Sequence, residues 1–229
     1  MIDGMLTIGR ILEVFTDEVK SRKGRVTDKF QDRRRLFVRS LLPHVADARP
    51  KDRMQGGLAL RATDDELWLH PYLFRQVCRN GAVVAQAIES LHVEYLGVYS
   101  VEEGTTMLRE AIAKCAEQRV FARSMRQVRL SMTVAVDWLN MLPYLAHFES
   151  TGIMGRTLAT ILERFDIGAD RTRFGVMNAV TSVARDTRDP DEKWRLEELG
   201  GSIGARLRPR QPSDAPGVER TAQAFVPVA

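Results

Sequence analysis

Arginine is the residue type in this sequence whose chemistry and spacing best suit the binding of a ligand. Its planar guanidinium can hold a phosphate through two parallel hydrogen bonds. Three groups of arginines supply the candidate binding residues Arg33, Arg34, Arg35, Arg75, Arg79, Arg123 and Arg126. Aromatic residues such as Phe30, Trp68 and Tyr72 lie near the first two groups. Because cationic and aromatic side chains together can hold a single strand by phosphate contacts and base stacking, we expect a surface that binds single-stranded DNA or RNA.

A second interpretation of the same residues stays open. The aromatic residues could belong to the core, and the arginines could form a solvated face. Arginine accounts for 28 of the 34 basic residues, a bias that a GC-rich genome produces throughout its proteins. The net charge of +4 therefore permits nucleic-acid binding without requiring it.

Residue types that carry catalysis or bind metals are scattered along the chain. The four histidines, His44, His70, His92 and His147, have no second ligand at helical or turn spacing. Cys78 fits a small core residue better than a nucleophile. Clustered carboxylates such as Asp64-Asp65-Glu66 and Glu102-Glu103 fit turns and helix caps, although a metal-dependent nuclease remains a third alternative. We therefore expect no catalytic residue, no bound metal and no cofactor.

Composition limits the class of protein. Apolar residues make up 44% and charged residues 28% of the 229 positions, which is typical of a globular domain. No apolar run approaches the roughly 20 residues of a membrane-spanning helix. The N-terminal residues lack the pattern of a signal peptide, and two cysteines are too few for a disulfide framework. These features predict a cytoplasmic protein that does not enter a membrane.

Strand signals dominate residues 25–99. Apolar and polar residues alternate on both sides of Asp64-Asp65, which predicts a hairpin with its turn at these residues. Residues 25–44 predict one or two further strands that end at Pro43, and polar residues 45–55 predict a surface loop. Asn80-Gly81 predicts a second turn, since both residues accept a positive φ. The sum is an antiparallel β-meander.

Helix signals dominate residues 100–204. Ser100 and Glu103 form a capping box, and Thr7 can cap an earlier helix at the N-terminus. Asp170 is expected to open another helix. Asp189-Pro190 opens the last one, which we expect to end at Gly200-Gly201.

Two segments are less regular. The spacing in 127–139 suits a helix or a strand, and its helical surroundings favour a helix. The tail, 205–229, has little patterning and is expected to be flexible. The predicted fold is therefore α+β in a single domain, 1–204, with the sheet first and the helices after it.

Two motifs carry a resemblance to a known family. The first comprises Arg75, Cys78, Asn80 and Gly81, and the second comprises Asn178, Ala179, Val180 and Thr181 followed by Leu196, Glu197 and Gly200-Gly201. Over residues 55–204 the chain resembles a phage- and plasmid-associated domain family of unknown function, whereas residues 1–50 match it poorly.

The resemblance also has implications for function. In its strand-then-helix order and its mobile-element setting, that family is similar to single-strand annealing proteins of the recombination-mediator type, which form rings that hold single-stranded DNA in a basic groove. The resemblance therefore implies a homo-oligomer that binds single-stranded DNA in recombination. The alternative is a protein-interaction or regulatory module without a nucleic-acid role, which would expose an apolar patch.

Overall fold

The computed structural model describes residues 6–76, 79–83, 89–94, 96–137 and 140–204, and it has an antiparallel sheet followed by helices. The strands are β1 (Arg25–Gln31), β2 (Arg35–Arg49), β3 (Asp52–Thr63), β4 (Glu66–Arg75), β5 (Asn80–Val83) and β6 (Leu91–Glu94). They are ordered β1-β2-β3-β4, and both β5 and β6 pair with β4 along its far edge. The predicted α+β class, with a meander in the N-terminal half, is confirmed.

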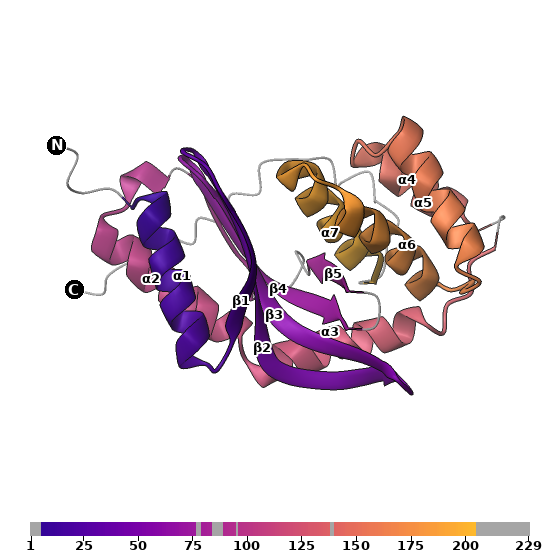
Figure 1. Cartoon of the computed structure of the whole chain (residues 1–229), viewed down its shortest axis with the longest axis horizontal. Coiled ribbons are helices and arrows are strands. Elements are labelled where there is room, and N and C mark those ends of the chain that lie inside the picture. Colours follow the sequence, from indigo (N-terminus) through magenta and orange to yellow (C-terminus); the bar gives the residue numbers. More distant parts are fainter. Residues whose placement is uncertain (1–5, 77–78, 84–88, 95, 138–139, 205–229) are drawn as a thin grey trace, which may run out of the picture.

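Helices lie on both sides of this sheet (Figure 1). They are α1 (Ile8–Ser21), α2 (Val101–Cys115), α3 (Gln118–Ser131), α4 (Leu142–Ser150), α5 (Gly155–Ile167), α6 (Arg173–Asp186) and α7 (Pro190–Gly204), with a 3-10 turn, η1, at Leu96–Val98. The pair α1 and α2 lies on one side, whereas α4 to α7 lie on the other. No helix in the described ranges is long and apolar enough to cross a membrane.

The sheet face toward α1 and α2 is apolar. Alternate strand residues point to it and pack against the helices; they include Leu36, Val38, Leu58, Leu60, Leu67 and Leu69. Ile11 and Phe15 of α1 are fully buried there. The side chain of Thr7 accepts a hydrogen bond from the amide of Arg10, as expected for the predicted cap.

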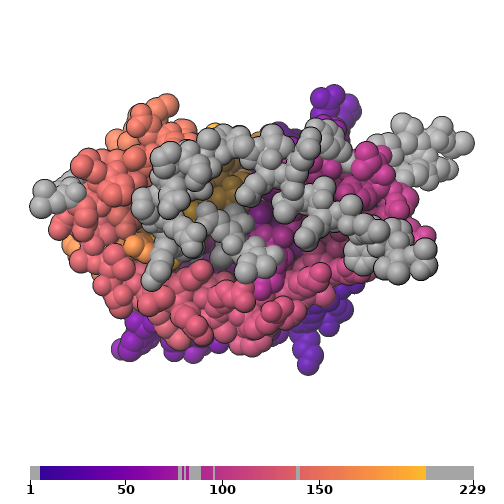
Figure 2. Space-filling model, turned by 180° about the vertical axis from the view of Figure 1, so that it is seen from behind, coloured from indigo at the N-terminus to yellow at the C-terminus, as the bar shows by residue number. Residues whose placement is uncertain are grey.

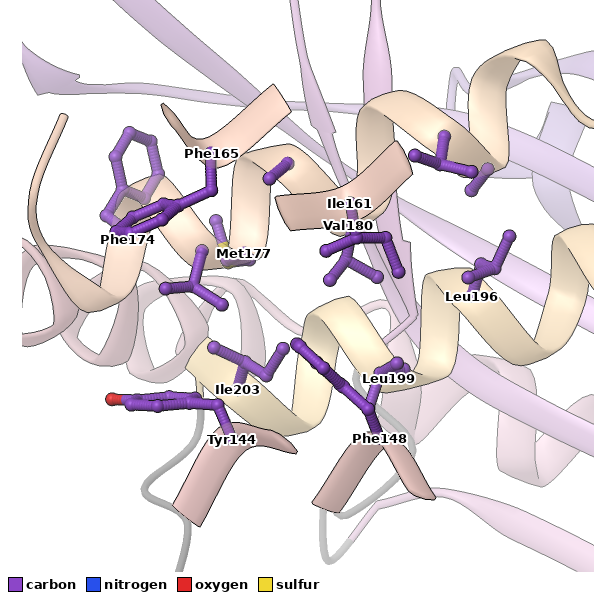
Figure 3. Close-up of a cluster of buried hydrophobic side chains, with 14 of the residues drawn as sticks. Tyr144, Phe148, Ile161, Phe165, Phe174, Met177, Val180, Leu196, Leu199 and Ile203 are labelled. Carbon is purple, nitrogen blue, oxygen red and sulfur yellow. The ribbon is translucent and has the colours of Figure 1, made fainter. Parts of the chain in front are cut away.

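The helices on the other side form most of a second core (Figure 3), which also includes Met54 of β3, Leu73 of β4 and residues of α3. Tyr144 and Phe148 of α4, Ile161 and Phe165 of α5, Phe174, Met177 and Val180 of α6, and Leu196, Leu199 and Ile203 of α7 point toward one another there. An added Cβ at Gly200 would lie 2.4 Å from Thr181 Cγ2. Glycine at this position therefore lets α6 and α7 pack closely, and α7 continues through Gly200-Gly201 to Gly204. The predicted end of this helix is wrong.

The predicted loop at 45–55 is also wrong, because β2 and β3 extend through it as a long hairpin. Pro43 does not end β2. Pairing passes from Leu41↔Gly57 to Val45↔Gln55, so the proline lies in an irregularity of the ladder, where its missing N–H costs no cross-strand hydrogen bond. The turn falls at Lys51, which has φ 66°.

Other local predictions are confirmed or corrected in part. The hairpin turn at Asp64-Asp65 and the capping box of Ser100 are present. Within 127–139, the residues up to Ser131 are helical, and Ala135 then forms an isolated bridge with Thr172. Thr172 caps α6 in place of Asp170. The tail 205–229 and Cys78 lie outside the described residues.

Candidate functional site

Charged side chains join α7 to the sheet. Asp189 caps this helix, its carboxylate accepting a hydrogen bond from Glu192 N at 2.7 Å. In the first turn, Asp191 lies 2.8 Å from a guanidinium nitrogen of Arg35 and 2.9 Å from one of Arg61. The interface of α7 with the sheet is therefore polar at its N-terminal end, in contrast to the apolar interface of α1 and α2.

One helical turn further along, α7 contributes Lys193 and Glu197, which are four residues apart and lie on one face. Glu197 Oε2 lies 2.6 Å from Arg39 Nη2 of β2. Arg39 Nη1 lies 2.5 Å from Asp28 Oδ2 of β1, and Lys193 Nζ lies 2.9 Å from the same oxygen. A chain of alternating charges thus runs from Lys193 through Asp28 and Arg39 to Glu197.

Burial changes the acidity of this network. The side chains of Arg39 and Glu197 are only 6% and 3% exposed. Burial raises the pKa of Glu197 to about 7, because the opposing charges of Arg39 and Lys193 do not fully compensate for lost solvation. Asp28 behaves differently. Burial opposes its charged form, but Lys193 and Arg39 together hold the pKa of Asp28 below its ordinary value.

These residues line a hollow of about 540 Å³ between the sheet and α6–α7, which we call the basic hollow. Its lining residues are Arg25, Thr27, Asp28, Arg39, Leu41, Tyr72, Phe74, Gln76, Arg79, Gly81, Arg185, Lys193 and Glu197. Five of them carry a positive charge, and only Asp28 and Glu197 are acidic. The volume lies within the range of small-molecule sites, and the excess of positive charge suits an anion.

Tyr72 of β4 and Gly81 of β5 form one wall of the basic hollow. A Cβ added to Gly81 would lie 1.7 Å from Tyr72 Oη, so only glycine leaves space for the tyrosine ring to cross β5. Asn80-Gly81 is therefore strand and not the predicted turn. The positive φ belongs to Arg79, at 53°.

Of the predicted binding residues, only Arg79 lines the basic hollow. Arg33 and Arg34 are exposed at the β1–β2 turn, and Arg35 follows them at the start of β2. They line a separate, open hollow of about 610 Å³. Its other lining residues are Asp32, Thr63, Asp64 and Asp65, so three arginines face three aspartates. This hollow has no excess of positive charge.

Arg75 has a structural contact. Its guanidinium donates to both oxygens of Asp52, at 2.6 and 2.7 Å, and it lies over the Phe174 ring at 5.1 Å. These contacts attach the β2–β3 hairpin to α6. Arg75 therefore connects the sheet with the helical core and does not line the basic hollow.

Arg123 and Arg126 lie on α3, away from the basic hollow. In Figure 2 the α3 segment forms part of the pink band along the lower edge of the molecule. An added Cβ at Gly56 would lie 2.8 Å from Phe121 of α3, so α3 packs on the sheet face opposite to Tyr72. Arg123 Nη1 lies 2.9 Å from Glu89 Oε1.

Four cationic lining residues, Arg25, Arg39, Arg185 and Lys193, were not among the predicted binding residues. One signal was present: Lys193 and Glu197 share a helix face after the Asp189-Pro190 cap. Within the described ranges, no group of three histidine, cysteine or carboxylate side chains could hold a metal ion.

No family model, no curated protein and no solved structure matches the chain.

Proposed function

We propose that this protein binds single-stranded nucleic acid in the basic hollow, as a binding protein and not as an enzyme. The observation that carries the proposal is the composition of the hollow, in which five cationic side chains outnumber two carboxylates beside the half-buried ring of Phe74. The cations suit backbone phosphates, and an aromatic ring offers a base a stacking partner whatever its sequence. By analogy with annealing proteins, a homo-oligomer would bring two strands together.

The sheet and α7 support this proposal physically. Arg25 and Arg79 are exposed, so they can meet a phosphate without a large loss of solvation. Lys193 is one-quarter exposed and Arg39 is almost fully buried, so cations lie from the mouth to the floor of the hollow. A flexible single strand could enter a hollow of this size more readily than a stiff duplex.

The test is the binding of a labelled oligothymidylate, followed by fluorescence anisotropy over a series of salt concentrations. With four phosphates neutralised by Arg25, Arg79, Arg185 and Lys193, log K should fall with log salt with a slope of about −3, at roughly 0.7 per phosphate for a single strand. Replacement of both Arg25 and Arg79 by Gln should halve this slope and weaken binding at low salt.

The matched control replaces Arg33 and Arg34 by Gln. It removes the same charge from the β1–β2 turn, where nearby aspartates balance the arginines. Its binding should stay close to that of the unmodified protein. Absence of binding at low salt, or an equal loss in both double variants, would contradict the proposal. Incubation of the strand with Mg²⁺ tests the nuclease alternative, which requires degradation.

No observation favours the protein-interaction alternative. Large exposed apolar side chains in the described ranges are Phe30, Val45, Val98, Leu130, Leu142, Met154 and Ile167. No two of them belong to the same helix or strand, so no single described element presents an apolar face through them.

A further inference from the structure

Asp28 occupies the position in the basic hollow where an anionic ligand would be expected. A single oxygen, Oδ2, contacts both Arg39 Nη1 at 2.5 Å and Lys193 Nζ at 2.9 Å. A phosphate oxygen placed between these two cations would receive the same hydrogen bonds. The carboxylate therefore does for Arg39 and Lys193 what a ligand oxyanion would do.

The two carboxylates that bind Arg39 differ in their freedom to leave it. Glu197 lies on α7 and its side chain is 3% exposed, whereas the side chain of Asp28 is 46% exposed. Asp28 also belongs to β1, which is an edge strand of the described sheet and pairs there with β2. The pairing register shifts between Val26 and Asp28, and such irregularities loosen a strand edge. Asp28 is thus the exchangeable partner, and Glu197 is the permanent one.

We propose that Arg39 and Lys193 form a subsite for one phosphate group, and that Asp28 masks this subsite until the ligand displaces its carboxylate. The inference rests on the proposed function only for the nature of the ligand, a phosphodiester of a single strand. While the subsite is empty of ligand, Asp28 keeps a buried guanidinium paired. When a phosphate enters, Arg39 keeps Glu197 and exchanges Asp28 for the phosphate, and Asp28 moves into solvent.

The experiment compares Asp28→Asn with the unmodified protein, using labelled oligothymidylate by anisotropy and inorganic pyrophosphate by calorimetry. Asparagine keeps the shape of the side chain but removes the competing charge. We expect both probes to bind about tenfold more tightly, since a like charge facing a ligand costs at least this much in an interface. The salt slope for the oligonucleotide should stay near −3, because the same phosphate contacts form in the unmodified protein once Asp28 has been displaced.

Two further variants separate masking from a general change in charge. Asp47→Asn also removes one negative charge, from a half-exposed residue that pairs with Arg53 and does not line the basic hollow. It should change affinity less than about twofold, because a distant exposed charge is screened by salt. Lys193→Met in the Asp28→Asn background should abolish most of the gain, since it removes half of the subsite.

The outcomes distinguish this inference from the proposed function. If Asp28→Asn binds neither probe more tightly than the unmodified protein does, the proposal that Asp28 masks the subsite is overturned. If neither protein binds the oligonucleotide but Asp28→Asn binds pyrophosphate more tightly, the nucleic-acid function fails and the masked subsite stands. Should Asp28→Asn not fold, Asp28→Thr serves the same comparison, because a β-branched residue suits an exposed strand.

Discussion

His70 should make the protein less stable in mild acid. It lies on β4 beneath α7, with its side chain 5% exposed and its ring centroid 5.9 Å from that of Trp194. Neither ring nitrogen has a hydrogen-bond partner in the described structure, and the nearest carboxylate oxygen, Glu198 Oε1, is 3.7 Å from Nε2. Burial, with a smaller effect of His92, lowers the pKa of His70 from 6.5 to about 4.

The sign and size of the effect follow from proton linkage. Between pH 6.5 and pH 4 the unfolded chain binds a proton at His70 that the folded protein does not, so stability falls as the pH falls through this window. One pKa unit corresponds to about 1.36 kcal/mol. Between pH 7 and pH 5, His70 should therefore lower the free energy of unfolding by about 2 kcal/mol.

His70→Phe tests this reasoning, because phenylalanine keeps the ring beside Trp194 and removes both unpaired nitrogens. At pH 7 the variant should be more stable by about 1 kcal/mol or more, since an unsatisfied buried polar atom costs about this much. Its advantage should grow by about 2 kcal/mol at pH 5. The measurement is urea unfolding of both proteins at a series of pH values between 5 and 7, which avoids the titration of most carboxylates.

A contrasting variant is available in His44, whose Nε2 lies 2.8 Å from the carbonyl oxygen of Ala116. His44→Phe removes a hydrogen bond and should destabilise the protein at pH 7. The reasoning would be refuted if His70→Phe were destabilising at pH 7, or if its stability relative to the unmodified protein did not depend on pH.

Three further predictions concern the basic hollow. Arg39→Met should lower the free energy of unfolding by about 3–5 kcal/mol in urea, because it leaves Glu197 buried without its partner. Glu197→Gln should become more stable relative to the unmodified protein by about 2 kcal/mol as the pH rises from 5 to 7, because a carboxyl group whose pKa is raised by folding stabilises the protein only below that pKa. A difference in stability that did not change with pH would contradict the raised pKa of Glu197. Gly81→Ala should cost about 1–3 kcal/mol in thermal unfolding and much less in a Tyr72→Leu background, because the clash is with the Tyr72 ring.

Local signals in the sequence were sufficient for much of the fold. The turn at Asp64-Asp65 and the caps at Ser100 and Asp189 depend on neighbouring residues, and all three are present. The hairpin at 45–55 was not predicted because most residues of this long two-stranded segment are polar, so the alternation of apolar and polar residues that usually identifies a strand is weak there. Its stability comes from distant contacts such as that of Asp52 with Arg75.

The candidate site could not be predicted in the same way, because its charge depends on pairing across the chain. Arg39 and Glu197 are 158 positions apart, and Arg35 and Asp191 are 156 apart. Sequence alone shows where arginines occur, but it does not show which of them a carboxylate neutralises in the folded chain. For that reason the run at Arg33 to Arg35 was favoured, although three aspartates surround it.

The polar contact between α7 and the sheet has a physical consequence for any ligand of the basic hollow. A buried guanidinium that waited for a phosphate without any partner would cost several kcal/mol of stability. Asp28 and Glu197 remove this cost, but a ligand must then compete with Asp28. The ion pair of Arg39 with Asp28 therefore stabilises the folded protein and at the same time weakens the binding of a phosphate. Asp28→Asn should bind phosphate more tightly and unfold more readily, and a variant that bound more tightly without any loss of stability would show that Asp28 does not stabilise the buried guanidinium.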